Sequence, residues 1–171
     1  MKRKISFCPV RRQTLSVHIM FYRFRCEAAF YRNLDRLPLH VRMKLDLTGI
    51  KLSLKDWLAF HIEERTAICH LPVDHEDEKQ AFRNYLNFLS QQYCGAPAPM
   101  LPAMDPLLWE MSNHVPGPVL ERSGHNGRAI TIEEWMGWAA HQRYALYKTA
   151  ISRSEPDKFF IVLDELRKDR S

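Results

Sequence analysis

One stretch of the sequence occurs twice, and this repeat constrains the fold more than any other feature. Residues 38–68 (PLHVRMKLDLTGIKLSLKDWLAFHIEERTAI) align without a gap with residues 116–146 (PGPVLERSGHNGRAITIEEWMGWAAHQRYAL), 78 positions later. Two tryptophans and two glycines in one register are difficult to obtain by chance, so we interpret the chain as a duplicated helix–loop–helix unit. The matching pairs include Pro38 and Pro116, Val41 and Val119, Gly49 and Gly127, Leu52 and Ile130, Ser53 and Thr131, Trp57 and Trp135, and Arg65 and Arg143.

Each copy predicts a short helix followed by a loop. Proline suits the first position of a helix, where its missing N–H is not needed. Short helices are therefore expected over about residues 38–46 and 116–123. Gly49 and Gly127 end them.

A capping box begins the next helix of each copy. Residues 53–56 (SLKD) and 131–134 (TIEE) place a hydroxyl three residues before a carboxylate, and both groups satisfy free backbone N–H groups at a helix start. Apolar residues at helical spacing follow, so we expect one long helix in each copy, the first ending near His70. Trp57 and Trp135 are predicted to be core residues rather than ligand-stacking residues.

A further helix follows each copy. The first is expected over about residues 75–93 after Asp74, and the second begins at Pro156. Phe82 and Phe160 also lie 78 residues apart, so the repeat includes this helix. The chain then divides into three-helix units at about 38–94 and 116–168, joined by a proline-rich connector over 95–115 that holds a short helix near Asp105.

The predicted fold is therefore all-α, with a single domain over residues 21–171 and its two halves related by a pseudo-two-fold axis. Such an axis would place loops 50–53 and 128–131 side by side. Their alternating apolar and polar residues predict a short two-stranded ribbon between the copies, with Leu52 and Ile130 pointing into the core. The aromatic-rich residues 21–30 are expected to form a strand or an irregular clamp across the core.

The formal charge of +5 is concentrated at the N-terminus. Residues 1–25 contain seven Lys and Arg and no acid, which leaves 18 basic against 20 acidic residues in the remainder. This distribution argues against nucleic-acid binding by the folded body. No apolar run approaches the length of a membrane span. Four widely spaced cysteines without a CxxC motif predict free thiols in a reducing compartment, the cytoplasm.

Residues 1–20 fit no element of the repeat. They are interpreted as a disordered basic tail or as an over-long gene start with Met20 as the initiator, and a presequence is the alternative. Deleting them is expected to leave the thermal stability unchanged.

No pattern predicts a catalytic residue, a metal site or a cofactor. The loops lack the alternating oxygen ligands of an EF-hand. Cys69, His70 and His75 are close together, but a fourth zinc ligand is missing. Phosphate-binding glycine loops, nucleophile elbows and zinc-protease motifs are absent from the sequence. The residues thus predict a protein that is not an enzyme.

Several motifs resemble the nitrate reductase associated protein family of cyanobacteria and other nitrate-assimilating organisms, over roughly residues 21–168. They are Pro38, Val41-Arg42-x-Lys44-Leu45-Asp46, Gly49-x-Lys51-Leu52-x-Leu54, Trp57, Arg65 and Gln142-Arg143-Tyr144-Ala145-Leu146-x-Lys148. The resemblance implies a non-catalytic accessory protein that supports assimilatory nitrate reductase, its partner, in assembly or cofactor insertion.

Four polar residues of the first motif are the predicted docking surface for this partner: Arg42, Lys44, Asp46 and Lys51. In the alignment of the two copies, Arg42, Lys44 and Lys51 correspond to Leu120, Arg122 and Ala129. The duplicated fold therefore does not need these charges. The alternative for the residues is a set of weak pairs on a helix surface. The alternative function is a sensor or an unrecognised enzyme that holds a small molecule in the groove between the copies. No pattern specifies an oligomeric state.

Overall fold

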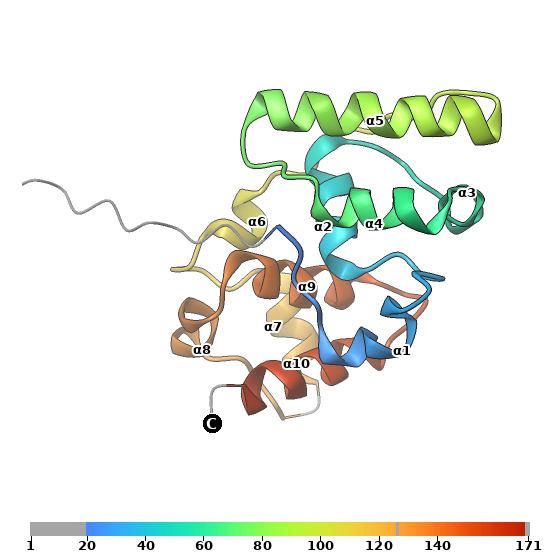
Figure 1. Cartoon of the computed structure of the whole chain (residues 1–171). Helices are drawn as coiled ribbons and strands as arrows, with labels where there is room; N and C mark the ends of the chain where they lie inside the picture. The colour runs from blue at the N-terminus through green and yellow to red at the C-terminus, as the bar shows by residue number, and fades with distance from the viewer. Residues whose placement is uncertain (1–19, 126, 170–171) are drawn as a thin grey trace, which may run out of the picture.

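Ten α-helices and one 3-10 helix form the regular structure of residues 20–125 and 127–169, the part of the chain that this computed structural model describes, and no strand occurs there (Figure 1). The prediction of an all-α fold is confirmed. The predictions for residues 1–19, including Cys8, lie outside the described residues. In chain order the elements are η1 (Arg25–Glu27), α1 (Ala28–Tyr31), α2 (Leu39–Thr48), α3 (Leu54–Ala59), α4 (Ile62–His70), α5 (Glu76–Cys94), α6 (Leu107–Glu110), α7 (Gly117–Gly124), α8 (Ile132–Gly137), α9 (Ala140–Ile151) and α10 (Lys158–Lys168).

Both predicted capping boxes are present. The Ser53 hydroxyl accepts a hydrogen bond from the backbone N–H of Asp56 (3.1 Å), and the Asp56 carboxylate accepts from Ser53 N–H (3.3 Å). Thr131 and Glu134 make the same two bonds at 3.2 and 3.0 Å. Helices α3 and α8 consequently begin and end at positions 78 residues apart.

The prediction of one long helix in each copy is wrong. Helix α3 stops at Phe60 and α8 stops at Trp138, and both residues have extended backbone, with ψ of 148° and 150°. Both aromatic side chains are buried. The next helix is then capped anew, because Glu64 accepts from His61 N–H (2.8 Å) and Gln142 accepts from Ala139 N–H (2.9 Å). Burial of an aromatic ring at the break offsets the lost helical hydrogen bonds.

Two hydrophobic clusters form the core, and each contains one repeat tryptophan, as predicted. Trp57 and Trp135 have no exposed surface. The indole N–H of Trp57 donates to the carbonyl of Leu34 (2.7 Å), which also accepts from Arg65 (2.8 Å). Leu34 has a left-handed φ of 47°, a conformation that these two donors hold in place.

The second copy fixes its preceding segment in a similar way. Trp135 donates to the carbonyl of Met111 (3.0 Å). Arg143 donates to the carbonyls of Trp109, Trp138 and Glu110 at 2.6, 2.6 and 3.0 Å. In both copies, a tryptophan and an arginine from later helices thus anchor the chain that leads into the first helix.

The third helix of the second half buries a different phenylalanine from the one that the 78-residue offset pairs with Phe82. Phe159 of α10 is fully buried and Phe160 is only partly buried, so the pairing of Phe82 with Phe160 stays a prediction. The connections that lead into the two helices differ in length, with α9 ending at Ile151 and α4 at His70, and this difference permits the shift. The duplication and the two-fold axis themselves stay an interpretation.

The predicted ribbon between loops 50–53 and 128–131 is also wrong. Ile50 instead forms an isolated antiparallel bridge with Met100 of the connector. Lys51 N–H donates to the Pro99 carbonyl (2.9 Å), and Leu101 N–H donates to the Gly49 carbonyl (2.7 Å). The connector supplies an extended backbone partner that the repeat alone does not contain.

Of the two loop residues expected in the core, Ile130 is buried and Leu52 is half-buried. In the second copy, the N–H of Ile130 donates to the Ser123 hydroxyl (3.3 Å).

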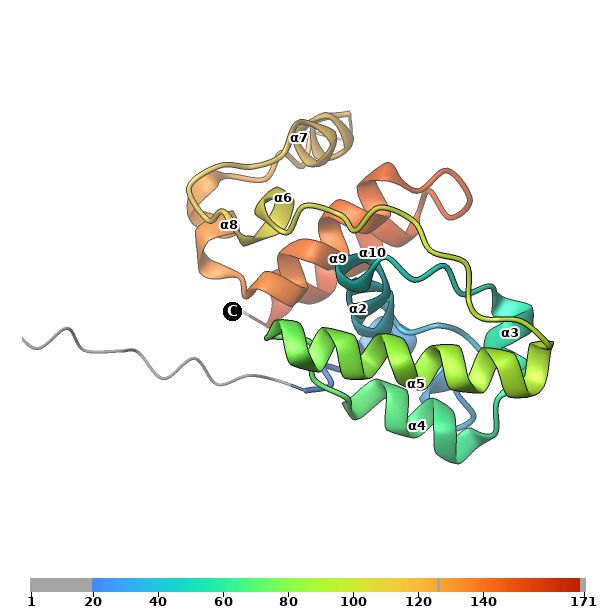
Figure 2. The same ribbon diagram turned by 90° about the horizontal axis from the view of Figure 1, so that it is seen from above.

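Helix α2 lies between the two halves, with α4 and α5 on one side and α9 on the other (Figures 1 and 2). Residues 21–37 connect both cores, since Phe24 belongs to the cluster around Trp135 and Leu34 to the cluster around Trp57. The prediction of a strand for the aromatic-rich residues 21–30 is wrong, because this segment contains η1 and most of α1 and is therefore partly helical. None of the described helices has the length and apolar composition needed to cross a membrane. Cys26, Cys69 and Cys94 are free thiols.

Candidate functional site

The four predicted docking residues occupy different environments on and after helix α2. Lys44 is only 2% exposed, and its ammonium donates to the carbonyls of Met20, Cys69 and Leu71 at 2.7, 2.6 and 2.6 Å. These bonds use all three of its protons. Burial lowers the pKa of Lys44 to about 8. Lys44 therefore joins α2 to the end of α4 inside the protein and does not present its charge on a docking surface.

Asp46 connects the two halves. Its carboxylate accepts from the Tyr144 hydroxyl and from the Lys148 ammonium, both at 2.6 Å and both on α9. Burial of the Tyr144 hydroxyl and the charge of the neighbouring Asp46 raise the pKa of Tyr144 well above its ordinary value. The polar pair between α2 and α9 is therefore a structural contact rather than a free acidic group.

Arg42 and Lys51 are the two cations of the motif that reach the surface. Arg42 is half-buried and donates to the Leu37 carbonyl (3.2 Å), while Lys51 is exposed beside the connector. The second copy also indicates that Lys44 has a structural role that Arg42 and Lys51 do not share. Arg122, the counterpart of Lys44, donates to the Pro156 carbonyl (3.0 Å) and so bonds the connection to a third helix, as Lys44 does.

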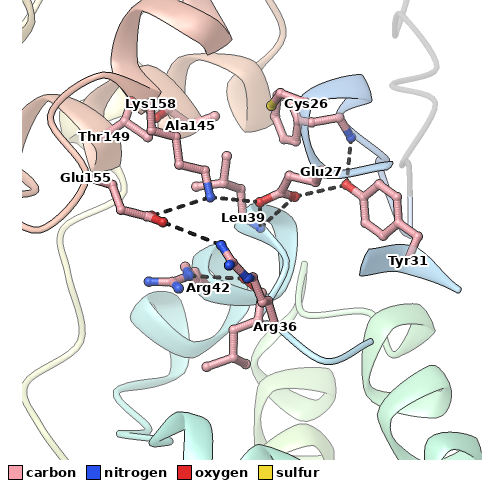
Figure 3. Close-up of polar contacts among 12 residues, drawn as sticks. Cys26, Glu27, Tyr31, Arg36, Leu39, Arg42, Ala145, Thr149, Glu155 and Lys158 are labelled. Carbon is pink, nitrogen blue, oxygen red and sulfur yellow. Dashed lines mark hydrogen bonds and ion pairs between the residues drawn. The ribbon is translucent and has the colours of Figure 1, made fainter. Parts of the chain in front are cut away.

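A buried carboxylate that the sequence analysis missed closes the N-terminal end of α2 (Figure 3). Glu27 has no exposed surface and accepts from the N–H of Leu39 (3.1 Å), the hydroxyl of Tyr31 (2.9 Å) and the ammonium of Lys158 (3.3 Å). Loss of hydration raises the pKa of Glu27, and Lys158 and the other donors oppose this shift. Because Pro38 makes no side-chain capping bond, Glu27 caps α2 and ties it to α10. The sequence contained one signal for this buried carboxylate, because Glu27 is an acid within the aromatic-rich residues 21–30.

A cleft of about 520 Å³ lies between the two halves, on the α2 face that carries His40 and Lys44. Its other walls come from the α4–α5 connection, from α6 and from the start of α9. The lining includes Met20, His40, Met43, Lys44, Leu47, residues 72–75, Lys79, Pro106, Trp109, Glu110 and residues 139–141. The alternative function expected from the sequence requires a cleft of this kind.

Two histidines that line this cleft, His40 and His141, lie beside each other with ring centres 5.8 Å apart. Burial, with smaller contributions from Lys44 and His141, lowers the pKa of His40 to about 3. Burial and the neighbouring Arg143 lower the pKa of His141 to about 4. Both imidazoles are therefore neutral at physiological pH and can bind a ligand through N–H and lone-pair contacts.

Metal ligation finds no support in the described residues. They contain no group of three or more His, Cys, Asp or Glu side chains placed to hold an ion. Cys69 is buried, which raises the pKa of its thiol to about 12, and the ring Nδ1 of His70 contacts the Thr66 carbonyl (2.8 Å). Cys69 and His70 therefore have separate environments in the fold.

Comparison with known proteins identifies one family. The model of the conserved nitrate reductase-associated protein family matches residues 21–166. No curated protein and no solved structure matches the chain.

Proposed function

Since the chain belongs to the family of conserved nitrate reductase-associated proteins, we propose that it is a non-catalytic accessory protein that binds assimilatory nitrate reductase in the cytoplasm and supports its assembly or cofactor insertion. The family match over residues 21–166 is the observation that carries this proposal. Exposed apolar side chains grouped on one surface mark a candidate site for binding between the two polypeptides.

The connector provides such a surface. Five large apolar side chains within twelve residues are between 37% and 56% exposed: Met100, Leu101, Leu107, Leu108 and Met111. We name these five residues the connector face. Between Cys94 and Leu120 the only charged residues are Asp105 and Glu110, so this stretch contains no Lys or Arg. Its partner segment on nitrate reductase is accordingly apolar.

Lys51 lies at the edge of the connector face. The bridge between Ile50 and Met100 and the bond from Lys51 N–H to Pro99 place this exposed cation next to the exposed Met100 and Leu101. Lys51 therefore extends the docking surface with a positive charge. Arg42, the half-buried cation of the motif, is tested by a separate variant.

Co-purification from the native host tests the proposal. Tagged wild-type protein is expected to capture nitrate reductase. The double variant Leu107→Glu/Leu108→Glu is expected to lose the captured enzyme and to slow growth on nitrate, because charge on the connector face opposes an apolar contact. Lys51→Glu and Arg42→Glu are expected to weaken capture to a smaller extent.

Phe88→Glu/Ile161→Glu is the matched control, since both residues are exposed apolar side chains on α5 and α10 and do not belong to the connector. This variant should capture nitrate reductase as the wild type does. Equal capture by the connector variant and the control would exclude the connector face. Absence of nitrate reductase from the wild-type capture would contradict direct binding.

A further inference from the structure

We propose that a small cavity at the N-terminal end of α2 binds a tetrahedral oxyanion such as inorganic phosphate. The cavity has a volume of about 230 Å³ and lies where α2, the end of α9 and the start of α10 meet. Its lining contains three cations, Arg42, Lys148 and Lys158, and one acid, Glu155. The cavity shares no residue with the connector face, so the proposal does not depend on binding to nitrate reductase.

Arg42 provides the hydrogen-bond donors on which the proposal mainly rests. Its Nε donates to the Leu37 carbonyl (3.2 Å), whereas its two terminal nitrogens have no hydrogen-bond partner among the described residues. These nitrogens are not among the buried polar atoms that lack a partner, so both remain accessible to solvent. Because Arg42 lines the cavity, the remaining N–H groups of its guanidinium can donate to a ligand there.

Two lysines bring further positive charge to the same cavity. The Lys148 ammonium donates to the Asp46 carboxylate (2.6 Å), and the Lys158 ammonium donates to the Glu27 carboxylate (3.3 Å). Each of these bonds uses one of three ammonium protons. The two lysine side chains are only 27% and 18% exposed, so the contacts hold them in place. Both ammonium groups therefore keep protons that a ligand oxygen can accept.

The charges around the cavity include one more cation than acid. Following the ion pairs outward from the cavity, Asp46 balances Lys148 and Glu27 balances Lys158. Glu155 in turn balances Arg36, which lies outside the cavity lining. Arg42 is then the one cation of this group that has no acidic partner in the described part of the chain. The end of α9 and the start of α10 contribute partial charges of opposite sign, so Arg42 decides the preference for an anion.

Glu155 is the acid with which a ligand has to compete. Its carboxylate lies 3.7 Å from the Lys158 ammonium and 3.8 Å from Arg36, and both distances are longer than a hydrogen bond (Figure 3). The Glu155 side chain is 45% exposed and belongs to the loop between α9 and α10. Such exposed pairs contribute little stability. An oxyanion can therefore replace the Glu155 carboxylate beside Lys158 at small cost.

The size of the cavity and the direction of its donors select a compact oxyanion. A volume of about 230 Å³ is smaller than that of most organic-ligand sites, which is about 300–1,000 Å³. The cations come from three different helices, so a ligand needs acceptor oxygens that point in several directions. Phosphate meets this requirement and forms strong charge-assisted hydrogen bonds with guanidinium and ammonium groups.

Isothermal titration calorimetry of the full-length protein with phosphate tests the site, with chloride at the same ionic strength as the reference. Phosphate is expected to bind saturably with a dissociation constant of about 1 mM, and chloride to give no saturable signal. Methyl phosphate is the second ligand. If it binds more tightly than phosphate, the site is assigned to the phosphate group of a small organic molecule. Absence of saturable phosphate binding would overturn the proposal.

Three variants localise the binding. Arg42→Met is expected to weaken phosphate binding at least about tenfold. Arg153→Met is the matched control, because Arg153 is an exposed cation near the cavity but outside its lining, and it should bind as the wild type does. Glu155→Gln removes the competing carboxylate and is expected to tighten binding about threefold or more.

Glu155→Gln also keeps the test decisive if Arg42→Met does not fold, since Glu155 is exposed and contributes little to stability. Unchanged or weaker phosphate binding in Glu155→Gln would refute the assignment. Wild-type affinity in a folded Arg42→Met variant would refute it as well.

Discussion

Replacing Gly49 by alanine should release the connector from the loop after α2, and Gly127→Ala is the matched control. Both glycines have left-handed backbone, with φ of 71° and 64°. A Cβ atom at Gly49 would lie 2.4 Å from the carbonyl oxygen of Leu101, whereas a Cβ at Gly127 would have no atom within 4 Å. The two substitutions therefore share the backbone strain and differ in the contact with the connector.

The expected magnitudes follow from these contacts. Alanine in the left-handed region costs about 1–2 kcal/mol at either site. At Gly49 the Leu101 carbonyl must also retreat, which breaks the hydrogen bonds from Leu101 to Gly49 and from Lys51 to Pro99. At about 1 kcal/mol for each bond, Gly49→Ala should lower the free energy of unfolding by about 2 kcal/mol more than Gly127→Ala.

Chemical denaturation followed by tryptophan fluorescence measures this difference, with the dependence on denaturant concentration compared between the variants. Gly49→Ala should also increase proteolysis within the connector, because its backbone contacts are lost. If the two alanine variants unfold at the same denaturant concentration, the connector does not pack tightly on Gly49, and the explanation for the pairing of Ile50 with Met100 is refuted.

Three further predictions concern the core, the contact between the halves and the response to pH. Trp57→Ala and Trp135→Ala should each lower the free energy of unfolding by about 3–5 kcal/mol, and an unchanged denaturation midpoint would show that the residue is not a core anchor. A double-mutant cycle of Asp46→Ala and Tyr144→Phe should give a coupling energy of about 1 kcal/mol, while strict additivity would contradict the hydrogen bond between α2 and α9. Burial lowers the pKa of His40 from 6.5 to about 3, so the unfolded chain takes up a proton first as the pH falls, and the stability present above pH 6.5 is lost toward pH 3. His40→Gln should make the free energy of unfolding depend less steeply on pH within this window, and an unchanged slope would exclude His40 as its source.

Local signals in the sequence predicted local structure correctly. The capping boxes at Ser53 and Thr131 require only residues three positions apart, and both helices begin as expected. Trp57 and Trp135 were assigned to the core because of their size and their place in an apolar helical pattern. By contrast, no Gly or Pro stands beside the break at Phe60, and Gly137 stands before the break only in the second copy. The burial of both rings against distant residues accompanies the break in each copy.

The candidate site could be predicted only in part, because its residues meet through tertiary contacts. Lys44 was expected at the surface because it is charged, but the carbonyls that bind it lie 25 and 27 residues away, beyond the reach of any local pattern. His40 and His141 belong to different helices, and nothing in the spacing of the sequence brings them together. The predicted ribbon is wrong for the same reason. The symmetry argument took only the two repeats into account, whereas the connector pairs with the backbone groups of Ile50.

The bonds between Glu165 and the segment near the N-terminus affect the order in which the protein folds during translation. The Glu165 carboxylate accepts from the backbone N–H groups of Arg25 (2.6 Å) and Cys26 (2.8 Å), 140 and 139 residues earlier in the chain. Arg25 and Cys26 leave the ribosome long before α10 does. Phe24 therefore lacks some of its final neighbours until α10 has been synthesised. Until then a nascent chain exposes aromatic surface that chaperones can bind.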